Sequence, residues 1–136
     1  MSDPVLREKG RAVRRQLVGD ICADKLDREV YTDPHMEKFG EITQEVLFAQ
    51  LWTRPGLDLK TKSMVTLITD VSTGSFEAMS LHVRFCRIHG WTEDEVVEAM
   101  LHCIGYLGVP LVRKSILVAR DVFKEMRENG ELADGQ

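Results

Sequence analysis

The 136-residue chain lacks features that would each place it in a particular class of protein. Its longest apolar runs, such as residues 116–119, are far shorter than the roughly 20 residues needed to cross a bilayer. Its N-terminus leads from Met-Ser-Asp-Pro into a charged stretch without an apolar core, which predicts no secretory signal. We therefore expect no membrane insertion and a cytoplasmic location.

Cysteine is scarce, and charge of one sign does not dominate. Cys22, Cys86 and Cys103 are an odd number with no CxxC pair, which disfavours a disulfide framework or a zinc ribbon. The formal net charge is −4, with acidic and basic residues interspersed, so we expect no nucleic-acid partner. A hydrophobic content of 43% with 29% charged residues is typical of a globular protein, and the length suits one domain over residues 1–136.

Helical periodicity runs through almost the whole chain. Apolar residues recur three or four positions apart, and no window alternates with period two, which predicts an all-α bundle. We expect a surface helix followed by five core helices, with these ranges: 4–18, then 34–52, 58–74, 75–89, 93–107 and 110–130. The helices at 75–89 and 93–107 are predicted to form an antiparallel hairpin. Residues 64–71 are apolar on more than one face, which suggests cover from other subunits and hence a homo-oligomer.

Polar residues within these apolar patterns are the candidate functional residues. His82 lies on the apolar stripe of its predicted helix. Glu98, His102 and Tyr106 recur at intervals of four on the next helix. The two histidines can face one cavity and transfer protons, because imidazole titrates near neutrality. The alternatives are a core histidine bonded to a carbonyl and a polar row that faces solvent.

Arg54 is the best-placed cation, because it lies beside Trp52 and is fixed by a Pro-Gly turn. It can bind a carboxylate through two hydrogen bonds, or simply complement a helix dipole. Lys62 adds positive charge or is merely exposed, and the sequence favours exposure. Glu45 lies between apolar residues and can act as an acid if it is buried, although a surface position is more common.

Several kinds of chemistry have no support in the sequence. There is no glycine-rich phosphate loop and no serine in a nucleophile elbow. Metal binding by His82 and His102 stays open, although neither HxxxH nor HExxH spacing is present. Cys86 and Cys103 lie on apolar stripes and are interpreted as core residues. We therefore predict neither a metal nor a cofactor.

Four blocks of sequence carry a family resemblance. They read LWTRPGLD at residues 51–58, LHVR at 81–84, GWTEDEV at 90–96 and EAMLHCIGYLGVP at 98–110. In this order and spacing they resemble the carboxymuconolactone decarboxylase family, over roughly residues 10–125. The resemblance implies a compact all-α bundle of the carboxymuconolactone decarboxylase and alkylhydroperoxidase-like type. It also implies assembly into trimers or hexamers.

The same resemblance implies a cofactor-independent carboxy-lyase. Its substrate would be 4-carboxymuconolactone or a related carboxylated lactone of aromatic-compound catabolism, in the β-ketoadipate pathway, and its product an enol-lactone. His82 and His102 would share oxyanion stabilisation and proton delivery. Tyr106 would orient one histidine, and Glu45 would tune one. These four residues are the predicted catalytic set.

A second set of residues would bind the substrate. Arg54 would hold a carboxylate, and Trp52 would form a wall of the pocket. Lys62 and Arg113 would add positive charge where they face that pocket. The chain departs from the family pattern at five positions, which leaves the natural substrate open: Ala49, Gln50, Lys62, Ala78 and Arg113. The alternatives are a thiol-dependent peroxidase-like protein acting through Cys86 or Cys103, and a non-catalytic oligomer that binds acidic small molecules.

Overall fold

The computed structural model describes residues 3–132 and divides into two units, each with its own internal packing. The first unit ends at Asp58, and the second begins at Leu59. All regular secondary structure in the described residues is helical, which confirms the predicted all-α class. None of these helices is both long and apolar enough to span a bilayer. The organisation as a single domain stays a prediction.

The first unit contains three α-helices and a π-helix: α1 (Pro4–Val18), α2 (Asp20–Glu29), α3 (Pro34–Ile42) and η1 (Thr43–Leu51). The predicted helix starts at Pro4 and Pro34 are confirmed, with Asp3 and Asp33 accepting hydrogen bonds from the first-turn amides. Helix α2 was not predicted, because its sequence is polar over most of its length. The chain from 43 to 51 winds as a π-helix rather than continuing the expected α-helix.

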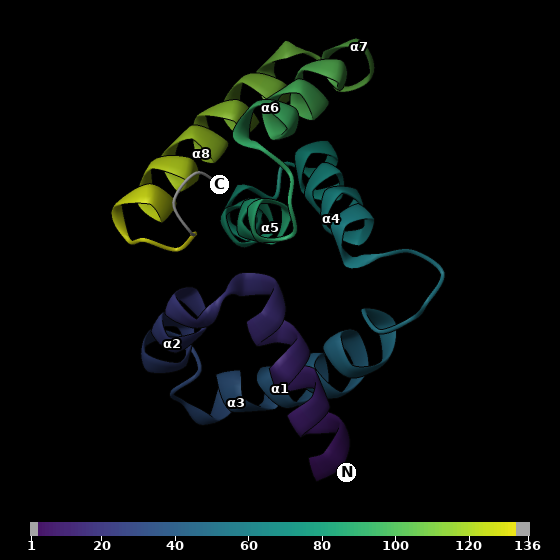
Figure 1. Ribbon diagram of the computed structural model, residues 1–136, viewed down its shortest axis with the longest axis vertical. Helices are drawn as coiled ribbons and strands as arrows, with labels where there is room; N and C mark the ends of the chain where they lie inside the picture. Colours follow the sequence, from purple (N-terminus) through teal and green to yellow (C-terminus); the bar gives the residue numbers. More distant parts are fainter. Residues whose placement is uncertain (1–2, 133–136) are drawn as a thin grey trace. The chain divides into compact units, whose positions relative to one another are not determined.

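Helix α1 packs against η1 at very close range (Figure 1). The approach depends on Gly10, where an added Cβ would lie 1.8 Å from the backbone oxygen of Gln44. No side chain fits in that space, so glycine is required there by contact rather than by backbone conformation. Gly10 therefore fixes how α1 and η1 lie together within this unit.

The second unit contains five α-helices: α4 (Leu59–Thr73), α5 (Phe76–Ile88), α6 (Glu93–His102), α7 (Ile104–Leu107) and α8 (Val109–Glu128). Figure 1 shows α5 end-on between α4 and α8, and these three helices together with α6 contribute to one apolar core. Its fully buried members include Leu67, Met79, Val83 and Met100. Truncation of such a side chain typically costs about 2–5 kcal/mol, so this core is the main source of stability in the unit.

Two details of the predicted helices are wrong. Residues 75–89 and 93–107 do not form a closely packed hairpin, because α5 packs mainly on α4 and α8 while α6 packs mainly on α8. The second of these helices is also interrupted at Cys103, which separates α6 from the short α7. Within this single chain Val65, in the segment 64–71, is 55% exposed, and its cover by other subunits stays a prediction. Assembly into a homo-oligomer stays a prediction.

Candidate functional site

The turn between α4 and α5 holds the most distinctive polar arrangement of the second unit. Helix α4 ends in a Schellman motif, in which the Ser75 amide donates to the Asp70 carbonyl at 2.9 Å and the Gly74 amide donates to the Val71 carbonyl at 3.4 Å. Gly74 has φ +67°, which a residue with a side chain adopts only at a cost. The main chain at Asp70 is therefore held in place by the motif that ends its helix.

The Asp70 side chain pairs with His82, the histidine predicted to be catalytic. Oδ2 of Asp70 and Nδ1 of His82 form a short hydrogen bond between α4 and α5. The Asp70 side chain is 9% exposed and that of His82 is 22% exposed. A carboxylate this deeply buried needs a partner to offset its lost hydration, and the imidazole supplies one. The alternative interpretation of His82, as a core histidine bonded to a carbonyl group, is therefore wrong.

The imidazole of His82 keeps one nitrogen for other partners. Its ring packs edge-on against Phe85, with 5.0 Å between the ring centroids and 67° between the planes. Within residues 3–132, no hydrogen bond reaches Nε2, and this atom is not among the buried polar atoms that lack a partner. The ring is thus fixed on one side by Asp70 and Phe85, while Nε2 is left to exchange a proton or to bind an oxygen atom.

Cys86 lies one helical turn beyond His82 and is fully buried. Burial raises the pKa of its thiol to about 12, and the negative charge of Asp70 adds to the increase. At pH 7 a thiol with this pKa is ionised in only about one molecule in 10⁵, so its nucleophilicity is very low. Cys103 is also buried, and its thiol donates to the Ala99 carbonyl at 3.4 Å. These contacts support the interpretation of both cysteines as core residues.

The polar row on α6 and α7 faces solvent in this chain. Glu98 and His102 are exposed, and the Tyr106 side chain is 80% exposed. The rings of His102 and Tyr106 are neighbours, with 5.6 Å between their centroids, and no hydrogen bond joins them in the described part of the chain. His82 and His102 therefore have separate partners. Their convergence on one cavity stays a prediction, as does the orienting role of Tyr106.

Lys62 and Arg113 are the predicted substrate-binding residues of the second unit. Lys62 lies half-buried in the first half of α4 and is thus less exposed than predicted. Arg113 is exposed, four residues after the start of α8. Both side chains are positioned by helices of this unit, and their roles in substrate binding stay predictions.

The other predicted site residues belong to the first unit. Glu45 is largely buried, with 13% of its side chain exposed, and its Oε1 accepts a hydrogen bond from the Asp3 amide at 2.8 Å. Nε of Arg7 is 3.8 Å from the same oxygen, so Glu45 ties η1 to the start of α1. Trp52 is 7% exposed, and Arg54 is exposed in the turn that follows. Catalytic and substrate-binding roles for these residues stay predictions.

The first unit also has an open cavity of about 460 Å³. Arg7 and Arg11 line it from α1, and Glu37 and Glu41 line it from α3. None of the eight predicted site residues is among those lining it. Arg7 already pairs with Glu41 at 2.9 Å, so the charges in the cavity largely compensate one another and favour no one ligand charge.

Asp70 is the residue of this site that the sequence-based prediction missed. Its signal was a carboxylate among the apolar residues of the segment 64–71, three residues after Leu67 and therefore on the same buried face. Such a position predicts a buried acid with a specific partner. The identity of that partner depends on the packing of α5 against α4, which no local pattern specifies. No group of three or more potential metal ligands occurs in the described residues.

Comparison with known proteins supplies a family and two similar enzymes. Residues 37–121 match the sequence profile of the carboxymuconolactone decarboxylase family. A 4-carboxymuconolactone decarboxylase of Acinetobacter baylyi is 29% identical over 126 residues, which cover 93% of this chain and 92% of that enzyme. A nitrosuccinic acid decarboxylase of Metarhizium robertsii is also 29% identical over 126 residues, covering 93% of this chain and 87% of that enzyme.

Proposed function

The chain belongs to the carboxymuconolactone decarboxylase family, and from this premise we propose that it is a cofactor-independent decarboxylase of a small dicarboxylic acid. The similarity of this chain to two named decarboxylases supports the reaction type. The observation that carries the proposal is the pairing of buried Asp70 with His82, which leaves one imidazole nitrogen without a hydrogen-bond partner among residues 3–132. We propose 4-carboxymuconolactone, or a related carboxylated lactone, as the substrate.

This reaction requires little from the protein. The bond between the ring carbon and the departing carboxylate breaks, and carbon dioxide leaves. The electron pair passes through the conjugated double bond to the lactone carbonyl, forming a dienolate. A proton then adds to carbon and gives the enol-lactone. The protein must therefore bind a dianion, stabilise a developing oxyanion and deliver one proton.

His82 is the proposed proton donor. In its cationic form, the imidazole donates the Nε2 proton to carbon while Nδ1–H stays bonded to Asp70. The ring then regains a proton from solvent, which its partial exposure of 22% allows. A positioned general acid typically contributes about 10²–10⁴ in rate, so His82 is the residue whose loss should be felt most.

The two similar enzymes suggest what a substrate must contain. In nitrosuccinic acid and in 4-carboxymuconolactone, one carbon bears a carboxylate, a CH₂–COO⁻ arm and an electron acceptor. The acceptor is a nitro group in the first compound and an unsaturated lactone in the second. We extend the proposed substrate class to succinates that carry such an acceptor on the carbon that loses carbon dioxide. Plain succinate lacks the acceptor and should not react.

The remaining predicted residues keep their roles in this proposal. His102 would stabilise the oxyanion, with Tyr106 and Glu45 supporting the histidines. Arg54 would bind the second carboxylate, and the family resemblance implies a trimer or hexamer. Substrate-binding residues should raise KM when they are removed, whereas catalytic residues should lower kcat.

The thiol-dependent alternative has less support. A peroxidase needs a thiolate, and the pKa of about 12 at Cys86 keeps that thiol protonated at neutral pH. Replacement of Cys86 and Cys103 together should leave peroxide consumption unchanged. The non-catalytic alternative predicts binding of acidic small molecules without release of carbon dioxide, which the assay below detects directly.

The test is a carbon dioxide release assay with 4-carboxymuconolactone, nitrosuccinate and succinate. We expect turnover of at least one of the first two compounds and none of succinate. His82→Gln should lower kcat by about 100-fold or more. His35→Gln is the matched control, because the His35 side chain is 96% exposed at the start of α3. Wild-type turnover by a folded His82→Gln variant would remove His82 from the mechanism.

A further inference from the structure

We infer that Asp70 is a positioning residue for His82, acting by accepting the Nδ1 proton and so presenting Nε2 as the nitrogen that exchanges protons. The inference rests on the proposed function for its catalytic consequence. Its structural part, the choice of tautomer and ring rotation, stands on the contacts of the second unit alone. Neither the family match nor the similar enzymes assign a role to this carboxylate.

The first step of the argument is the chemistry of the pair. An ionised carboxylate has only acceptor atoms, so the ring nitrogen that contacts Oδ2 must carry the proton. Nδ1 of His82 is therefore protonated whether the ring is neutral or cationic. In the neutral ring the lone pair is then on Nε2, and in the cationic ring Nε2 carries the mobile proton. In either state, proton exchange is assigned to one atom.

The second step is that Asp70 is itself rigidly held. The Asp70 carbonyl accepts a hydrogen bond from the Ser75 amide at 2.9 Å in the Schellman motif. Asp70 lies four residues before Gly74, where φ is +67°. The side chain of the acid is 9% exposed, so few other rotamers are open to it. A fixed acceptor on α4 can therefore fix the orientation of a ring on α5.

The third step concerns the surroundings of the ring. Phe85 packs edge-on against the imidazole at 5.0 Å, which restricts its rotation from a second side. Cys86 lies close enough to Asp70 for the carboxylate charge to raise the pKa of its thiol, which therefore stays neutral. Within the described residues this thiol makes no hydrogen bond to either member of the pair. The carboxylate thus has His82 as its one side-chain hydrogen-bond partner in the described residues. This exclusivity is typical of an acid that orients an imidazole.

The experiment measures the tautomer directly by long-range ¹H–¹⁵N correlation spectroscopy of the histidine rings in the full chain. His82→Gln identifies the His82 signals among those of the four histidines. In the wild-type protein we expect the shift of a protonated Nδ1 at neutral and mildly alkaline pH. A wild-type spectrum in which Nδ1 is unprotonated and Nε2 carries the proton would overturn the inference, and this measurement requires no folded variant at Asp70.

The second arm is Asp70→Asn, which keeps the shape of the side chain but presents an amide that can also donate. We expect mixed or reversed ring tautomers at His82 and a fall in kcat of about 100-fold, with KM within about threefold of the wild-type value. A merely structural role would change stability without changing the ring shifts. A folded Asp70→Asn variant with wild-type shifts and wild-type kcat would overturn the inference.

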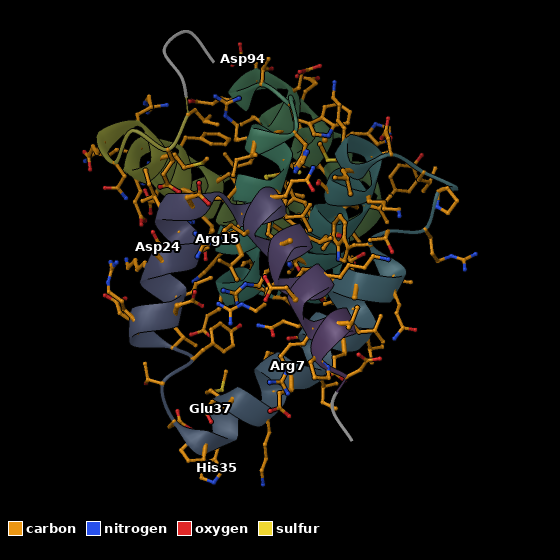
Figure 2. The ribbon with its side chains drawn as sticks, turned by 60° about the horizontal axis from the view of Figure 1, so that its bottom comes forward. Arg7, Arg15, Asp24, His35, Glu37 and Asp94 are labelled. Carbon is orange, nitrogen blue, oxygen red and sulfur yellow. The ribbon has the colours of Figure 1, made fainter. Side chains whose placement is uncertain are left out.

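The matched control is Asp94→Asn, which removes an exposed carboxylate in the first turn of α6 (Figure 2). It should leave both the ring shifts of His82 and kcat unchanged. If the wild-type protein released no carbon dioxide from any compound tested, the proposed function would fail. The tautomer spectra of the wild-type and Asp70→Asn proteins would still decide the positioning role, so the two failures are distinguishable.

Discussion

Two sets of ion pairs, one in each unit of this chain, keep their charged groups in different environments. In the first unit, Arg15 pairs with Asp20 at 3.1 Å and with Asp24 at 2.9 Å, and the three side chains are 37%, 80% and 56% exposed; Figure 2 labels Arg15 and Asp24. In the second unit, Arg84 pairs with Glu131 at 2.9 Å, and these side chains are only 6% and 4% exposed. The same chemical pair is thus hydrated in one unit and buried in the other.

The difference explains why the candidate site stands out in the second unit. A buried charge has lost its hydration, so it persists only with a specific partner, and its presence indicates a structural or functional requirement. An exposed ion pair needs no such partner and contributes little. Asp70 of the Asp70–His82 pair is buried, whereas the charged residues around the cavity of the first unit are exposed or half-buried.

The largest difference in stability should come from breaking the buried pair. Arg84→Met leaves Glu131 buried without its cationic partner, and the Ser80 carbonyl loses the hydrogen bond that the guanidinium donates to it at 3.0 Å. We expect the free energy of unfolding to fall by about 3 kcal/mol. Urea denaturation followed by circular dichroism measures this change.

The matched variant is Arg15→Met in the first unit, which should cost less than about 1 kcal/mol because its partners stay hydrated. Adding Glu131→Gln to Arg84→Met should recover part of the loss, since the uncompensated charge is then removed. Equal losses of unfolding free energy in Arg84→Met and Arg15→Met would show that burial does not make the Arg84–Glu131 pair more important for stability than the exposed pairs of Arg15.

A smaller but still substantial effect is expected at the contact of α1 with η1. In Gly10→Ala, the added methyl group would meet the Gln44 backbone oxygen at 1.8 Å, so one helix must move. We expect a loss of about 2–3 kcal/mol, measured by thermal or urea unfolding. Gly40→Ala is the control, because its Cβ would make an ordinary contact of 3.5 Å with the Tyr31 ring. A similar loss in both variants would mean that the contact with Gln44 does not set the effect, since helix propensity alone favours alanine over glycine at both positions.

The sequence was most informative where local signals act alone. Asp33 followed by Pro34 predicted a helix start, and the Thr92–Glu95 capping box is present with both of its hydrogen bonds. Helix α2 and the π-helix were missed, because neither has an apolar period that differs from its surroundings. Local patterns thus locate helix ends better than they identify winding or packing.

Only one member of the Asp70–His82 pair could be predicted from the sequence. His82 was found from its place on an apolar stripe, but its partner Asp70 is 12 residues earlier on another helix. Their contact depends on how α4 and α5 pack after the turn at Gly74, which is set by tertiary contacts. Glu98 and Tyr106 show a second limit of prediction from sequence. A row of polar residues at intervals of four is equally compatible with a cavity and with a face exposed to solvent.

The smallest expected effect on stability is at Glu95 on the surface of the second unit, where the carboxylate is hydrated like the exposed charges of the first unit. The Thr92 amide donates a hydrogen bond to the Glu95 carboxylate at 2.9 Å, and this bond, with a smaller contribution from the Thr92 side chain, holds the pKa of Glu95 below its ordinary value of 4.5. Because the folded-state pKa is the lower one, the stabilisation is present above the ordinary value. It is lost as pH falls through the folded pKa.

Thr92→Ala removes the side-chain half of the capping box and should move the titration midpoint of Glu95 back towards its ordinary value, as followed by NMR of the carboxylate carbon. The difference in unfolding free energy between wild type and variant should shrink on acidification, since the Thr92 side chain stabilises ionised Glu95 only in the wild-type protein and protonation removes that contribution. Glu98→Ala, an exposed change on the same helix, should leave the Glu95 titration unchanged. If the difference in unfolding free energy grew as pH fell, the stabilising charge would not be that of Glu95. The exposed capping box would then differ from the hydrated ion pairs of the first unit.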